Sequence, residues 1–201
     1  MAKVSPQSLL SSSSSSCYMS LKREIFTVWM KSLIMSGNGC TVFDSHGEII
    51  YRMDNYDCRR NDRVYLMDAR GEVLLTVVRK KFSFTGHWEG YRSIGSKLEK
   101  GKPWFRVRKT CNILRDFPCQ VTVSCHENET DSFKILASAR RNSACKIVDR
   151  EGRLVAEVYL KKAPSGELLG DDVLTLVVEP FVDHSLVMGL VTVYNMIKRK
   201  I

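Results

Sequence analysis

The stretch that most constrains this fold lies near the end of the chain, where residues 184–197 read HSLVMGLVTVYNMI without a single formal charge. As a helix, this stretch is apolar on every face, because its Leu, Val and Ile side chains form two stripes and its methionines fill most of the space between them. A helix of that kind is buried either in a protein core or in a membrane. The first question is therefore which of the two surrounds it.

The length of the stretch favours a protein core. It spans about 21 Å as a helix, whereas a bilayer core of about 30 Å requires about 20 residues. Asp183 precedes it and the basic run 198–200 follows it, so charges block its extension at both ends. Asp183 can also cap a helix by accepting hydrogen bonds from the first free amides. We therefore expect a buried helix; the β-branched residues leave a terminal strand as an alternative, and a membrane anchor is the least favoured interpretation.

Before this stretch, the chain consists of short alternating or apolar runs separated by turn signals. Such runs occur at 24–31, 40–44, 64–68, 72–78, 104–109, 119–125, 133–138, 145–149, 153–161 and 173–179. Their number and spacing predict an all-β sandwich or barrel in one domain rather than βαβ units.

Three of the turns share the form D-x-x-G and begin at Asp44, Asp68 and Asp149. In such a turn the Asp carboxylate accepts a local amide hydrogen bond, and the Gly supplies the left-handed conformation that closes the hairpin. A calcium loop needs several oxygen ligands at fixed offsets, and one carboxylate per turn does not supply them. We therefore interpret the three segments as hairpin turns.

The N-terminal residues 1–22 differ in kind from the rest. They are Ser-rich and free of acidic residues, which predicts a disordered tail before a folded domain at residues 23–201. No Arg precedes Arg23, so a chloroplast transit peptide is not expected. The seven cysteines are odd in number, contain no C-x-x-C pair and follow no secretory signal. This usage predicts reduced thiols in an intracellular compartment.

Basic residues are concentrated in one segment. The formal net charge is +9, and residues 79–109 contain ten Lys or Arg and two Glu. The candidate anion-binding residues are Arg79, Lys80, Lys81, Lys97, Lys100, Lys102, Arg106, Arg108 and Lys109. Three interpretations remain open: a solvated strand face with its aromatic residues inward, an anionic-lipid surface with rings at the interface, and a nucleic-acid surface with aromatic residues that stack on bases.

Catalytic signatures are weak. The four histidines, at 46, 87, 126 and 184, lie far apart in the sequence, and no phosphate-binding glycine motif occurs. Cys125, His126 and Glu127 are contiguous, but neighbours in a strand point to opposite faces, which suits neither a catalytic triad nor a metal site. We expect a protein that is not an enzyme and that uses no cofactor and no metal.

A family resemblance covers about residues 21–201. The segments FTVWMKSL, CTVFDSHGEIIYRMDNY, LLTVVRKKFSFTGHWEGY, VAEVYLKK, DVLTLVVEP and VDHSLVMGLVTVYNMI closely resemble, in the same order, segments of the plant LURP-one-related family. This family is similar in structure to the tubby C-terminal domain and to phospholipid scramblases. The resemblance implies a roughly twelve-stranded β-barrel closed around a central, hydrophobic C-terminal helix.

The resemblance also favours the lipid interpretation, because tubby domains bind phosphoinositides through basic residues on the barrel surface. We expect a binding or regulatory module, without a transmembrane segment, that attaches to anionic phospholipid headgroups. Its expected location is the cytoplasm, with the membrane periphery or the nucleus as alternatives. The family context implies a role in defence-linked signalling or transcription.

Two alternatives stay open. The first is a nucleic-acid-binding or membrane-tethered transcription regulator. The second is a phospholipid scramblase-like activity. Scramblases are associated with calcium and with a membrane-inserted C-terminal helix, whereas this chain has no calcium loop and its apolar stretch is short.

Overall fold

The structure, a computed structural model, describes residues 18–31, 39–54, 63–80, 87–94, 97–98, 102–110, 119–125, 129–137 and 143–198. These residues form thirteen strands and one helix: β1 (Glu24–Trp29), β2 (Cys40–Phe43), β3 (Ile49–Asp54), β4 (Arg63–Asp68), β5 (Val73–Lys80), β6 (His87–Ile94), β7 (Lys97–Leu98), β8 (Phe105–Lys109), β9 (Cys119–Ser124), β10 (Thr130–Ala137), β11 (Ser143–Val148), β12 (Leu154–Leu160), β13 (Val173–Val178) and α1 (His184–Lys198).

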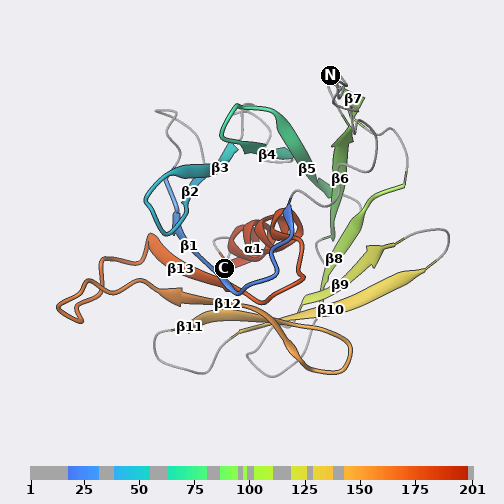
Figure 1. The fold of residues 1–201 in the computed structure, drawn as a ribbon. Helices are drawn as coiled ribbons and strands as arrows, with labels where there is room; N and C mark the ends of the chain where they lie inside the picture. The colour runs from blue at the N-terminus through green and yellow to red at the C-terminus, as the bar shows by residue number, and fades with distance from the viewer. Residues whose placement is uncertain are drawn as a thin grey trace, which may run out of the picture.

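Twelve of the strands form a closed antiparallel barrel around α1 (Figure 1). The order around the barrel is β5-β4-β3-β2-β1-β13-β12-β11-β10-β9-β8-β6, and the pairing of β5 with β6 closes it. The short β7 pairs only with β6 and stays outside the ring. The expected barrel of about twelve strands is therefore confirmed.

The apolar stretch is the helix α1, and it fills the barrel interior. Val187 and Val193 are fully buried, and Leu190 is nearly so. The helix begins as expected, because Asp183 Oδ1 accepts hydrogen bonds from the backbone amides of Ser185 and Leu186, at 2.9 and 3.2 Å. The alternative of a terminal strand is wrong. Within the described ranges, no helix combines the length and the apolar character that crossing a membrane requires.

Two barrel strands, β3 and β6, are absent from the expected runs; the hairpin turn that begins at Asp44 implies β3, whereas no pattern indicates β6. The buried positions of β6 are Trp88 and Gly90, and a Cβ atom at Gly90 would lie only 2.3 Å from the Phe105 ring. The same ring would lie 3.1 Å from a Cβ atom on Gly189 of α1. Phe105 therefore occupies the space that side chains at both glycines would need. Because Gly90 at the centre of β6 has no side chain, the sequence of β6 does not show the alternation of apolar and polar residues that marks a strand.

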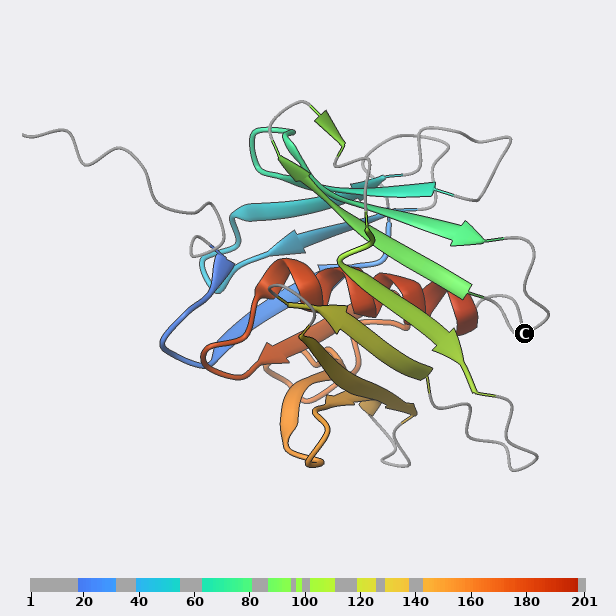
Figure 2. The same cartoon turned by 90° about the vertical axis from the view of Figure 1, so that its right-hand side faces the viewer.

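The barrel has two distinct ends (Figure 2). At the helix-N end, where α1 begins, lie the three D-x-x-G turns. In each, the Asp carboxylate accepts two backbone amide hydrogen bonds and the Gly has a positive φ of 82–85°, which confirms the predicted hairpin turns. At the helix-C end, where α1 finishes, β5 and β8 also finish. The 15-residue helix separates these ends by about 22 Å.

The residues just before β1 lie against the helix-N end. The Tyr18 ring centroid lies 6.3 Å from that of Tyr51, and the Ser20 carbonyl accepts a hydrogen bond of 2.8 Å from the Phe181 amide. Contacts with the barrel thus begin within the last residues of the expected tail, and residues 1–17 lie outside the described part of the chain.

Candidate anion-binding surface

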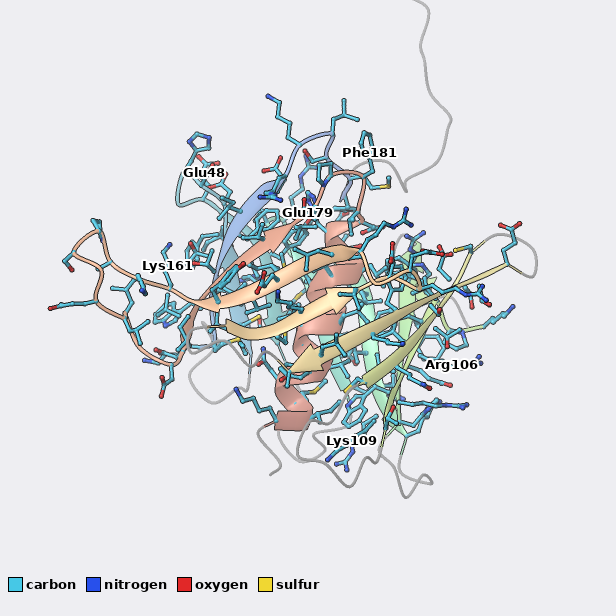
Figure 3. All side chains as sticks on the ribbon, turned by 90° about the horizontal axis from the view of Figure 1, so that it is seen from below. Glu48, Arg106, Lys109, Lys161, Glu179 and Phe181 are labelled. Carbon is cyan, nitrogen blue, oxygen red and sulfur yellow. The ribbon has the colours of Figure 1, made fainter. Side chains whose placement is uncertain are left out.

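The barrel divides the basic segment between its two ends. β5, β6 and β8 are neighbours that run in alternating directions, so residues close in sequence can lie at opposite ends of the barrel. Four of the candidates reach the helix-C end: Arg79, Lys80, Arg108 and Lys109. We call these four residues the basic end. In Figure 3, Lys109 and Phe181 mark the two ends and Arg106 lies on the wall between them.

The other described candidates do not belong to the basic end. Lys102 precedes β8 and lies at the helix-N end. Lys97 belongs to β7, the strand outside the ring. Lys81 and Lys100 fall outside the described residues. The predicted strip is thus a group of cations at one end of the barrel, with Arg106 and Lys102 increasingly distant from it.

Glu89, on the outer wall of β6, holds two of the candidate cations. Its carboxylate lies 3.1 Å from Lys80 Nζ and 3.2 Å from Arg106 Nε. It also accepts a hydrogen bond of 2.5 Å from the Tyr91 hydroxyl and lies 3.3 Å from His87 Nε2. Burial raises the pKa of Glu89, but these partners together lower it to about 2. Lys80 and Arg106 are therefore partly neutralised by a neighbour within the fold.

Two other cations, Arg79 and Lys109, lie on the inner side of the barrel wall at the helix-C end, which we also call the barrel mouth. The Arg79 guanidinium lies 5.8 Å from the centroid of the Trp88 ring, which is buried. Lys109 is paired in register with Cys119 of β9. Burial raises the pKa of the Cys119 thiol to about 11, and the Lys109 charge acts in the opposite direction. These side chains thus bring positive charge to the rim just above the apolar core.

Arg108 is the most available cation of the basic end. It is exposed and lies opposite Gln120 in β9 on the outer wall. Among the described residues, no acidic side chain forms an ion pair with Arg108. Within this part of the chain, no acidic side chain compensates the charge of Arg108, which suits it to an anion in solution or on a surface.

At the helix-N end, a basic side chain beside an aromatic ring stabilises the fold. The Arg92 guanidinium lies 2.9 Å from Asp183 Oδ2 and 3.7 Å from the centroid of the Trp104 ring. The same Asp183 caps α1. Arg92 therefore ties the start of the helix to the barrel wall and covers one face of Trp104.

The described residues contain no group of three His, Cys, Asp or Glu side chains that could hold a metal ion. His87 belongs to the cluster around Glu89, and His46 lies in the β2–β3 turn. His184 is buried with its ring centroid 5.1 Å from that of Phe26, and burial lowers its pKa. The remaining histidine, His126, lies outside the described residues. The expectation that the protein is not an enzyme stays a prediction.

Sequence reasoning missed the role of Glu89 and the division of the basic segment. Both follow from β6, which was not recognised as a strand. Antiparallel neighbours alternate in direction, so each hairpin returns the chain to the end from which it came. The predicted strand 104–109 already separates Lys102 from Lys109; with β6 counted between β5 and β8, the alternating directions would also place Arg79 and Lys109 at the same end.

Fold and surface together define a closed antiparallel β-barrel with a helical core and a group of cations at one end. The family model described as LURP-one-related matches residues 24–195. The chain therefore belongs to the LURP-one-related family.

Relatives from Arabidopsis thaliana resemble nearly the whole chain. Protein LURP-one-related 11 is 42% identical over 98% of this chain and 89% of its own length, and Protein LURP-one-related 4 is 44% identical over 98% and 87%. The X-ray structure of a further Arabidopsis thaliana protein matches with a TM-score of 0.62 at 15% identity, over 90% of this chain and 94% of that one. This match confirms the fold.

Proposed function

We propose that this protein is a non-enzymatic binding module that attaches peripherally to anionic, phosphoinositide-containing membranes. The observation that carries the proposal is the basic end, where exposed Arg108 lies without an ion pair among the described residues, near Arg79 and Lys109. A cation near a membrane surface contributes about 1 kcal/mol of attraction to anionic lipids. Release from the membrane, or exchange for a protein partner, is the regulatory step. A role in defence-linked signalling stays a prediction from the resemblance.

The aromatic residues support a lipid partner over a nucleic acid. Binding of unpaired bases needs exposed rings on which the bases stack. Trp88 is buried, and Arg92 covers Trp104. Tyr91 donates its hydroxyl hydrogen bond to Glu89. In the described part of the chain, these rings offer no open platform for bases.

A vesicle flotation assay tests the proposal. The full chain is mixed with phosphatidylcholine vesicles, with or without phosphatidylinositol bisphosphate, and we expect flotation only with the phosphoinositide. Arg108→Glu should weaken binding, whereas Arg108→Lys, which keeps the charge, should bind nearly as well as the unmodified chain. Binding should also decrease as the salt concentration rises, because exposed charges are screened.

Three outcomes would contradict the proposal. The first is equal binding to neutral and phosphoinositide-containing vesicles. The second is sequence-selective retention of DNA at physiological salt, which would favour the nucleic-acid alternative. The third is calcium-dependent lipid movement in reconstituted vesicles, which would favour a scramblase-like activity.

A further inference from the structure

Two cations outside the basic segment extend the basic end around the barrel mouth. Arg63 begins β4, the strand beside β5, and Lys198 ends α1 in the centre of the barrel (Figure 1). Both side chains are exposed. Neither forms an ion pair with an acidic side chain in the described ranges. Positive charge thus extends from the wall formed by β4, β5 and β8 to the end of the central helix.

Among the described residues of the helix-C end, little negative charge opposes these cations. Asp54, at the end of β3, is buried, and Glu89 already holds two basic side chains. The helix dipole adds only about half a negative charge, and Lys198 lies in the last turn to offset it. On the side of the same end formed by β1, β13 and β12, three bases and three acids balance: Lys31, Lys161, Lys162, Glu167, Asp171 and Asp172.

The helix-N end has the opposite character. Each of its three D-x-x-G turns contributes acidic residues: Asp44, Glu48, Asp68, Glu72, Asp149 and Glu151. Several of its arginines are paired with acids, as in Arg23 with Glu179 at 2.8 Å and Arg92 with Asp183 at 2.9 Å. The described residues are therefore more acidic at the helix-N end, although the exposed cations Lys22 and Lys102 also lie there, and more basic at the helix-C end.

We propose that the protein meets an anionic bilayer end-on, with the helix-C end on the membrane, α1 along the membrane normal, and Arg63 and Lys198 in contact with headgroups. This inference rests on the proposed function and adds an orientation and two contact residues. The two ends lie about 22 Å apart along α1, whereas the Debye length is about 8 Å at physiological salt. Only the end that faces the bilayer contributes to binding. A side-on approach through β6 would present Arg106, whose charge Glu89 already compensates.

Two double variants with the same change of charge test the orientation. The first combines Arg63→Glu with Lys198→Glu at the helix-C end. The second combines Lys22→Glu with Lys102→Glu, which are exposed positions at the helix-N end. Flotation of the full chain with phosphatidylcholine vesicles that contain phosphatidylinositol bisphosphate should show a loss of affinity of at least about 30-fold for the first variant. The second variant should change by less than about two-fold.

The outcomes separate this inference from the proposed function. Equal losses in the two double variants, or a larger loss in the helix-N variant, would overturn the end-on orientation. No binding by the unmodified chain would remove the proposed function itself. The pair Arg63→Gln with Lys198→Gln guards against misfolding, because it removes charge without adding any. This Gln variant should give the same near-UV circular dichroism spectrum as the unmodified chain and should still lose affinity for the vesicles. Undiminished binding would overturn the assignment of the two contact residues.

Discussion

A single absent side chain, that of Gly90, lets the Phe105 ring lie between β6 and α1. A methyl group at this position would come within 2.3 Å of a ring carbon in a fully buried site. Overpacking of a dense core typically costs about 1–3 kcal/mol. We therefore expect Gly90→Ala to lower the free energy of unfolding by at least this amount, as measured by chemical denaturation.

A double-mutant cycle isolates the cause of that loss. Phe105→Leu is itself destabilising, but it removes the ring carbons that the new methyl group would meet. Gly90→Ala should therefore cost less in the Phe105→Leu background than in the natural chain. An equal cost in both backgrounds would show that the two positions do not interact, against the packing described here.

Protonation of Glu89 at acid pH should lower the free energy of unfolding. Its pKa is lowered from 4.5 to about 2 in the folded protein, so the unfolded chain takes up this proton at a higher pH than the folded protein. The resulting stabilisation is fully present above about pH 4.5 and is lost as the pH falls towards 2. Glu89→Gln removes the titrating group. We expect the difference in unfolding free energy between the natural chain and this variant to shrink over that pH range, and a constant difference would contradict the assignment.

At the scale of elements, the sequence predicts best those strands that bury one face. Residues of β9 alternate between buried and exposed, and its borders were predicted to within one residue. β6 also points alternate residues inward, but Gly90 leaves its pattern without an apolar centre. The helix was predictable because its stretch is uncharged and too short for a bilayer. The grouping of cations was not, since it depends on the direction of every strand between Arg79 and Lys109.

The Asp183 carboxylate stabilises the start of α1 in two ways. Asp183 caps the helix and also pairs with Arg92, which lies over Trp104. Loss of a cap costs about 0.5–2 kcal/mol, so Asp183→Ala should lower the free energy of unfolding by this amount plus the loss of the ion pair. Asp183→Asn keeps a capping oxygen without the charge. Denaturation should place it between the natural chain and the Ala variant, and a ranking with Asn below Ala would contradict the capping role.

At the scale of the whole molecule, the barrel and its helix form one core. The inner faces of the strands pack around buried residues of α1 such as Val187, Leu190 and Val193. A chain that ends at Pro180 retains every strand but lacks the filling of the barrel. We expect this truncated chain to be insoluble or to lack a near-UV circular dichroism signal. A chain that begins at Tyr18 is the control and should stay folded, whereas a soluble, cooperative fold of residues 1–180 would refute a shared core.

The pairing of β1 with β13 also bears on how the chain is made. β1 emerges early in translation, and its partner from Val173 onward follows about 150 residues later. At about 5–20 residues per second, the partner strand is made roughly 8–30 s after β1. During this interval the growing sheet has an open edge and an uncovered apolar face, since α1 is made after every strand. The ring of strands is complete only after β13 has been made, and its interior is filled only after α1 has been made. The nascent chain depends on protection from aggregation until then.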